Sequence, residues 1–189
     1  MRIVVMGDSI SEGQYLTPGE KAWPFLIKGS DDIVNHGVSN DTTRMMLERF
    51  PRDVQELEPE IVIMQAGHND ANHWESDRGL PRVARDAYQA NLREMIRRVR
   101  QFDAMPMVCT IVPSLRAGSY NKDLERYNDA LLVACEVCDV EVIDVRAAFA
   151  AAKSLEPLLL DDRLHLSAAG HKLYAGTVEK ALRALRVAA

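Results

Sequence analysis

The sequence predicts an α/β fold in which helices cover both faces of a parallel sheet. Two observations lead to this prediction. Short apolar runs rich in β-branched residues recur along the chain, and they are continuous rather than alternating with polar residues, as in strands buried on both faces. Segments with helical periodicity lie between these runs. Such an alternation indicates βαβ units joined by right-handed crossovers.

Five apolar runs are expected to form the strands: Ile3 to Met6, Ile33 and Val34, Ile61 to Met64, Met107 to Val112, and Val140 to Val145. Three sets of apolar residues at helical spacing, within 88–99, 124–134 and 173–185, predict helices between and after them. Ser167 is placed to cap the last helix. The segment 42–57 also has a helical pattern, but Pro51 should break or kink it, so an interrupted helix is expected there.

Length and composition favour one globular domain over residues 1–189, because a chain of this length buries a core large enough to fold alone. The apolar fraction of 47% and the charged fraction of 27% exclude a disordered chain. The net charge is −5, and the arginines are interleaved with acidic residues. Nucleic acid is therefore not expected as a partner.

Neither the N-terminus nor the cysteines suggest export or a metal. The first apolar run is too short for a signal peptide or a membrane span, which predicts a cytoplasmic protein with no membrane span. The odd number of cysteines, Cys109, Cys135 and Cys138, suits a reducing compartment. The last two have C-x-x-C spacing, but no second pair of ligands accompanies them and they lie late in an expected helix. Buried or idle thiols are favoured over zinc or redox chemistry, and no metal site is expected.

Polar and glycine-rich segments follow the expected strands. Because the carboxyl ends of parallel strands meet at one edge of a sheet, where ligands bind, these segments should lie close together. They are Gly7-Asp8-Ser9-Ile10-Ser11, Asn35-His36-Gly37-Val38-Ser39, Ala66-Gly67-His68-Asn69-Asp70 and, beyond a further short helix, Asp161-Asp162-Arg163-Leu164-His165-Leu166-Ser167.

Ser9 is a candidate nucleophile at a strand-to-helix turn. A serine hydroxyl needs a base within hydrogen-bond reach, and His165 can serve as this base. Asp162, three residues before it, can accept a hydrogen bond from the other imidazole nitrogen; Asp161 is a less favoured orienter. Taken alone, Ser9 could merely cap a helix, and His165 could be an exposed loop residue.

A tetrahedral oxyanion would need about three donors. The candidates are the backbone amides of Ser9 and Gly37 and the side-chain amide of Asn69. Each of the last two residues would, taken alone, be an ordinary turn residue.

Together these segments resemble the ordered blocks of the SGNH/GDSL hydrolase family. The blocks are Gly7-Asp8-Ser9-Ile10, Gly37, Gly67-His68-Asn69-Asp70 and Asp162-Arg163-Leu164-His165, and they span nearly the whole chain in the right order. The resemblance implies a flavodoxin-like three-layer α/β/α sandwich with about five parallel strands and no cofactor. It also implies an esterase in which Ser9, Gly37, Asn69 and His165 are the name-giving residues. Asn40 stands where many members have glycine, an exchange that a left-handed backbone tolerates.

The substrate is less constrained, since the motifs are shared by esterases, thioesterases, lysophospholipases and carbohydrate deacetylases. His68, Trp74 and Arg116 are candidate substrate-binding residues. The polar loop around Trp74 favours a small-molecule ester with a small acyl group, such as acetyl, on a polar carrier. An equally well supported interpretation is that Trp74 packs on the scaffold and that the arginines form surface ion pairs with acidic residues. Longer acyl chains remain an alternative, and a non-catalytic module that binds a phosphorylated ligand is a minor one. The oligomeric state stays open.

Overall fold

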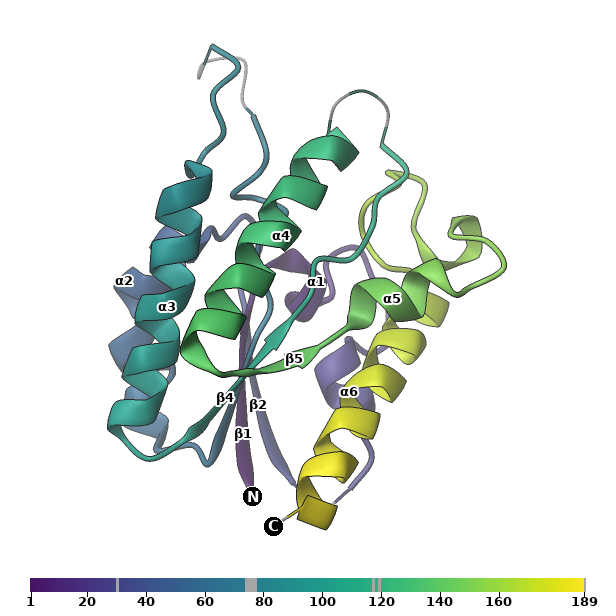
Figure 1. The fold of residues 1–189 in the computed structure, drawn as a ribbon. Coiled ribbons are helices and arrows are strands. Elements are labelled where there is room, and N and C mark those ends of the chain that lie inside the picture. The colour runs from purple at the N-terminus through teal and green to yellow at the C-terminus, as the bar shows by residue number, and fades with distance from the viewer. Residues whose placement is uncertain (30, 74–77, 117, 119, 189) are drawn as a thin grey trace.

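The protein is described by a computed structural model of residues 1–189, except residues 30, 74–77, 117, 119 and 189 (Figure 1). A single five-stranded sheet runs through the described residues in the order β2-β1-β3-β4-β5, and all its neighbouring strands are parallel. This confirms the expected parallel sheet. Its strands are β1 Arg2–Gly7, β2 Asp32–Gly37, β3 Ile61–Met64, β4 Met105–Cys109 and β5 Glu141–Ile143.

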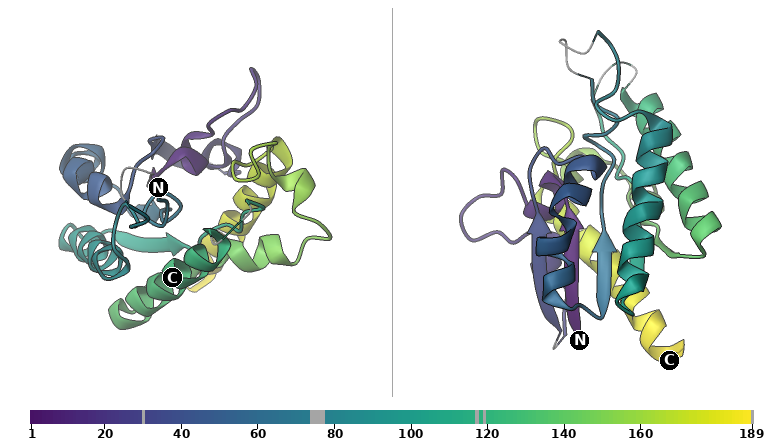
Figure 2. Two further views of the ribbon diagram at one scale, coloured as in Figure 1. Left: turned by 90° about the horizontal axis from the view of Figure 1, so that it is seen from above. Right: turned by 90° about the vertical axis from the view of Figure 1, so that its left-hand side faces the viewer.

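Helices lie on both faces of the sheet, so the three-layer α/β/α sandwich is confirmed (Figures 1 and 2). The α-helices are α1 Ser9–Glu12, α2 Thr43–Asp53, α3 Arg85–Gln101, α4 Tyr120–Cys138, α5 Val145–Ala150 and α6 Ala168–Ala188. Short 3-10 turns are η1 Trp23–Leu26, η2 Gln55–Leu57 and η4 Glu156–Leu158. One core lies between the sheet and α2, α3 and α4, and the other lies beneath η1, α5 and α6.

The strands are continuous apolar runs because each face of the sheet packs against its own core. In β1, Val4 and Met6 belong to the core under α2 to α4, whereas Ile3 and Val5 belong to the core under α6. All four side chains are fully buried. Neighbouring residues of a strand point to opposite faces, so both sets must be apolar.

Two expected strands are shorter than their apolar runs. The run predicted to end at Val112 leaves the sheet after Cys109, yet Ile111 and Val112 stay buried in the loop that follows. The run predicted to end at Val145 leaves the sheet after Ile143, because Asp144 caps α5 by accepting a hydrogen bond from the Ala147 amide at 3.0 Å. Burial continues in the loop after β4 and at Val145, the first residue of α5, which explains why hydrophobicity overestimates both strands.

Pro51 does not break the helix where the sequence predicted. It lies inside α2, and the interruption falls at Val54, which separates α2 from η2. Proline has no N–H to offer the carbonyl of Leu47, four residues earlier. The Arg98 Nη1 of α3 donates to this carbonyl at 3.4 Å instead. The neighbouring helix thus compensates part of what proline removes.

The C-terminal helix begins as expected. The Ser167 Oγ accepts a hydrogen bond from the Gly170 amide at 3.2 Å, which makes Ser167 the cap of α6. Within the described part of the chain, no helix has the length and apolar character that crossing a membrane requires.

Candidate active site

Ser9 is the first residue of α1, at the turn that follows β1. Asp8 caps this helix, since its Oδ1 accepts a hydrogen bond from the Ile10 amide at 2.9 Å. A Cβ atom at Gly7 would lie 2.2 Å from Ser11 Oγ, so glycine is needed where β1 meets the first turn of α1. This tight turn places Ser9, 6% exposed, at the carboxyl edge of the sheet.

The side chains of Ser9, His165 and Asp162 form one hydrogen-bonded series. The Ser9 Oγ lies 2.9 Å from His165 Nε2, and His165 Nδ1 lies 2.5 Å from Asp162 Oδ2. The first two residues are 156 positions apart in the sequence, and the loop before α6 carries the histidine back to the end of β1. The structure therefore brings together the three residues predicted as nucleophile, base and orienter.

Asp162 is fixed by its own loop. Its Oδ1 accepts hydrogen bonds from the amides of Leu164 and His165, at 3.0 and 2.9 Å. Burial raises the pKa of Asp162, but the hydrogen bonds from the imidazole and the two amides outweigh it and hold the pKa below its usual value. An ionised Asp162 favours a proton on Nδ1 of His165, which leaves Nε2 free to accept the serine proton. Asp161, the alternative orienter, is exposed.

Gly37, the last residue of β2, does not present a free amide as expected. The Gly37 amide donates to Asn35 Oδ1 at 3.0 Å, and a Cβ atom at Gly37 would lie 2.2 Å from the backbone nitrogen of Glu12. Close approach of β2 to α1 therefore accounts for this glycine, and its amide is already engaged.

Asn40, three residues further on, has a left-handed backbone with φ of +67°. Its amide donates to no acceptor among the described residues, whereas the amides of residues 38, 39 and 41 each have one. Asn40 therefore offers the free backbone donor of this loop.

Asn69 follows β3 at the same edge of the sheet. Its Nδ2 donates to the Asp41 carbonyl at 3.0 Å, which leaves the second N–H of the side-chain amide for another acceptor. The Ser9 amide likewise has no acceptor within the described ranges. The ends of three adjacent strands, β2, β1 and β3, thus carry three donors in Asn40, Ser9 and Asn69.

Two carboxyl groups are buried beneath this edge. Burial raises the pKa of Asp8 to about 7, against the hydrogen bonds from a backbone amide and from Gln65 Nε2. Burial also raises the pKa of Asp70 to about 6, although Thr43 donates to it through both its amide and its hydroxyl. Asp8 braces the first turn of α1, and Asp70 ties the start of α2 to the loop of Asn69.

The predicted substrate-binding residues lie in different surroundings. His68 is buried, its Nδ1 lies 3.0 Å from the Tyr120 hydroxyl, and burial lowers its pKa to about 3, so it is enclosed by protein and neutral. Arg116 is partly exposed; its Nε donates to the Asp162 carbonyl at 3.3 Å, and its Nη2 lies 3.7 Å from Asp162 Oδ2. Trp74 lies outside the described residues.

Sequence reasoning missed Tyr15. Its ring packs edge-on against the His165 imidazole, with centroids 5.0 Å apart and planes at 89°, while 63% of the residue is exposed. This contact depends on the loop after α1 lying beside the loop before α6, and no local pattern signals that neighbourhood. Tyr15 therefore forms one wall of the site beside the histidine.

The C-x-x-C spacing of Cys135 and Cys138 raised metal and thiol chemistry as alternatives. Among the described residues, no group of three or more histidine, cysteine, aspartate or glutamate side chains could hold a metal ion. Cys135 and Cys138 lie on α4 without a disulfide, and burial raises the pKa of Cys135 to about 12. A thiol with such a pKa is not a nucleophile at neutral pH.

Solved structures share this fold. A lipase/acylhydrolase from Enterococcus faecalis superposes with a TM-score of 0.81 at 22% identity, over 97% of this chain and 95% of that one. The structure named TesA superposes with a TM-score of 0.80 at 22% identity, over 98% and 99%. At this level of identity, the likeness extends to the fold alone.

Relatives identified by sequence share a higher identity with this chain than these structures do. The chain is 32% identical to an arylesterase of Vibrio mimicus over 68% of its length, and 27% identical to thioesterase 1/protease 1/lysophospholipase L1 of Escherichia coli over 64%. These matches span 60% and 56% of the two relatives' own lengths. An acetylxylan esterase of Geobacillus stearothermophilus is 29% identical over 76% of this chain and 68% of that protein.

The family description "GDSL-like Lipase/Acylhydrolase family" matches residues 5–173, a span that includes Ser9, Asn69 and the Asp162 to His165 block. By this match, the chain belongs to the GDSL-like lipase/acylhydrolase family.

Proposed function

We propose that this chain hydrolyses carboxylic esters with Ser9 as nucleophile, His165 as general base and Asp162 as the group that orients the imidazole. The observation that carries the proposal is the hydrogen-bonded series from Ser9 Oγ through His165 to Asp162. As the hydroxyl attacks the acyl carbonyl, its proton passes to Nε2. The imidazolium then protonates the leaving alcohol, and water repeats both steps on the acyl-enzyme.

Three donors would stabilise the tetrahedral oxyanion: the amides of Ser9 and Asn40 and the side chain of Asn69. Asn40 replaces Gly37 in this assignment, because the Gly37 amide is occupied by Asn35 and the Asn40 amide has no acceptor among the described residues. Donors fixed before the reaction can lower the barrier without reorganising during it.

The proposed substrate class is a small acyl group, such as acetyl, on a polar or carbohydrate alcohol. An exposed aromatic ring, Tyr15, and a partly exposed cation, Arg116, flank the His165 and Asp162 pair. Both suit a polar leaving group better than a long aliphatic chain. The relative named acetylxylan esterase, matched over 76% of this chain, supports the same class.

Thioester or lysophospholipid hydrolysis is the second candidate. The relative whose name gives thioesterase and lysophospholipase activities supports it, and the apolar face of Tyr15 could also receive an acyl chain. Acyl-chain preference separates the two candidates. A module that only binds phosphate has no need of a base hydrogen-bonded to Ser9.

The test is initial hydrolysis of p-nitrophenyl esters from acetate to octanoate by the wild type and by Ser9→Ala. We expect the rate to fall at least about 10³-fold in Ser9→Ala, with a maximum at acetate in the wild type. Ser154→Ala, which removes an exposed hydroxyl that bonds only Glu156 among the described residues, is the control and should keep its rate. Equal rates in Ser9→Ala and the wild type would exclude Ser9 as nucleophile. A maximum at longer chains would favour the second candidate.

Two further predictions concern the cellular location of the protein and its partners. The proposed location is the cytoplasm, supported by three unpaired cysteines. The absence of nucleic-acid binding stays a prediction that rests on the net charge of −5.

A further inference from the structure

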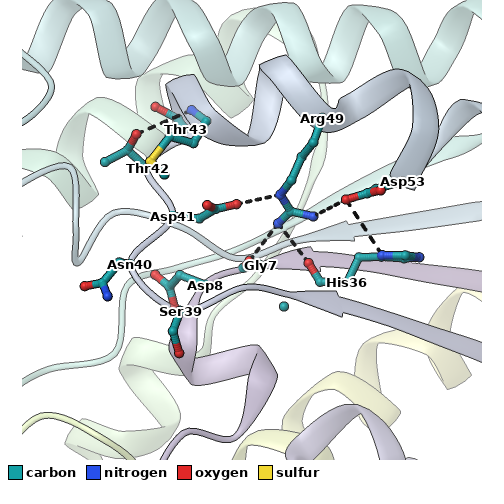
Figure 3. A network of polar contacts seen from close by, with 12 residues as sticks. Gly7, Asp8, His36, Ser39, Asn40, Asp41, Thr42, Thr43, Arg49 and Asp53 are labelled. Atoms are coloured by element: carbon teal, nitrogen blue, oxygen red, sulfur yellow. Dashed lines mark hydrogen bonds and ion pairs between the residues drawn. The ribbon is translucent and has the colours of Figure 1, made fainter.

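Arg49 of α2 is held by four acceptors at the carboxyl edge of the sheet (Figure 3). Its Nε donates to Asp41 Oδ2 at 2.5 Å, and its Nη1 donates to Asp53 Oδ2 at 2.8 Å. Its Nη2 donates to two backbone carbonyls, those of Gly7 at 3.1 Å and His36 at 2.9 Å. Only 13% of the arginine side chain is exposed, so these bonds form largely away from water.

Three of these acceptors, the carbonyls of Gly7 and His36 and the carboxylate of Asp41, belong to the segments that carry the proposed oxyanion donors. Gly7 lies two residues before Ser9, and the Gly7 carbonyl also accepts the Val38 amide at 3.0 Å. Asp41 follows Asn40 directly, and its carbonyl is the acceptor of Asn69 Nδ2. One guanidinium therefore connects, directly or through Asp41, all three segments that present a donor.

The fourth acceptor, Asp53, allows a control that distinguishes a positioning role of Arg49 from simple charge compensation. Asp53 is also paired with Arg52, whose Nε donates to Asp53 Oδ1 at 2.6 Å. Both arginines lie on α2 and share this carboxylate. The Arg52 side chain, however, is 75% exposed and bonds only Asp53 within the described residues. Arg52 thus provides a matched arginine without contact to the oxyanion segments.

We propose that Arg49 is a positioning residue, which fixes the Ser9 turn and the Asn40 loop relative to each other so that their donors converge on the oxyanion. The inference rests on the proposed function. Arginine suits this role because its planar fork offers five N–H donors in fixed directions, and lysine cannot reproduce that pattern. A misplaced donor weakens transition-state stabilisation far more than substrate binding.

The experiment compares Arg49→Met, Arg49→Lys and the control Arg52→Met with the wild type on p-nitrophenyl acetate. We expect kcat to fall about 10- to 100-fold in Arg49→Met, with KM changed less than about 3-fold. Arg49→Lys should fall between Arg49→Met and the wild type, and Arg52→Met should keep its kcat.

A second readout is inhibition by phenylboronic acid, which adds to a catalytic serine as a tetrahedral anion while the serine proton passes to the histidine. Its inhibition constant should rise in Arg49→Met by about the factor that kcat falls, because both depend on the same donors. A structural role alone would lower the amount of folded enzyme and leave this constant unchanged. If Arg49→Met does not fold, Arg49→Lys decides by the same two measurements.

The proposal is wrong if the Arg49 variants that fold keep the wild-type kcat and the wild-type boronate constant, or if Arg52→Met loses as much of both. A wild type that hydrolyses no ester would instead remove the proposed function, and the role of Arg49 would fall with it.

Discussion

In the proposed assignment, position 40 requires a left-handed turn and a free backbone amide, not a particular side chain. Asn40→Gly keeps both, because glycine adopts positive φ without strain. We expect its kcat on p-nitrophenyl acetate to stay within about 3-fold of the wild type.

Asn69 contributes a side-chain donor, so Asn69→Ala should lower kcat by about 10²- to 10³-fold. If both variants lose activity equally, the Asn40 side chain takes part and the assignment of its amide is wrong.

The exchange of Gly37 for Asn40 as a proposed donor shows what the sequence could not reveal about the site. The residues of the Ser9, His165 and Asp162 series follow from their types and spacing only together with the resemblance of their blocks to the SGNH/GDSL family. The prediction of Gly37 as a donor rests on its match to the name-giving glycine of the family, but the structure shows a steric need there, since a Cβ atom would meet the backbone of Glu12. Which amide lacks an acceptor is a tertiary property, and it has no local signature.

Arg49 gives a second example at this scale. In the sequence it is one of two arginines near the end of an amphipathic helix, and nothing distinguishes it from Arg52. Their side chains are 13% and 75% exposed in the structure. The difference arises because Arg49 faces the ends of β1 and β2, and the orientation of α2 on the sheet sets that contact.

Among the elements, the contact between β2 and α1 predicts a strong effect of one added methyl group. Gly37→Ala retains the amide but places Cβ 2.2 Å from the backbone nitrogen of Glu12, so β2 and α1 must separate. We expect the free energy of unfolding to fall by about 3 kcal/mol, measured by urea denaturation.

The matched control for this change is Gly176→Ala in α6. A Cβ atom there meets nothing within 4 Å, so alanine should raise the free energy of unfolding by about 0.5–1 kcal/mol through its higher helix propensity. A Gly37→Ala variant as stable as the wild type would show that the close approach of β2 to α1 is not required.

The elements themselves were largely predictable, because both their periodicity and their apolar content follow from burial on two faces. The errors lie where burial continues without regular structure. Ile111 and Val112 are buried in a loop beyond β4, and apolar content cannot distinguish such a loop from a strand. Pro51 lies within α2, where a side chain of another helix, Arg98, donates to the carbonyl that proline leaves without a donor, and this tertiary contact has no signal in the local sequence.

In the whole molecule, the two cores share one sheet, and this arrangement bears on the prediction of a single domain. Phe50 of α2 packs in one core and Phe149 of α5 packs in the other, and both are fully buried. If each core were an independent unit, weakening one would leave the other intact. Since β1 contributes Val4 to the first core and Val5 to the second, we expect the cores to unfold together.

Phe50→Ala and Phe149→Ala should therefore each lower the free energy of unfolding by about 3–5 kcal/mol, in a single transition. The measurement is urea denaturation followed by both tryptophan fluorescence and far-ultraviolet circular dichroism, and the two curves should coincide for each variant. Phe25→Ala removes a ring that is 53% exposed and should change stability by less than about 1 kcal/mol. Separate transitions in either core variant would mean that the faces of the sheet unfold independently, which would contradict a single cooperative domain.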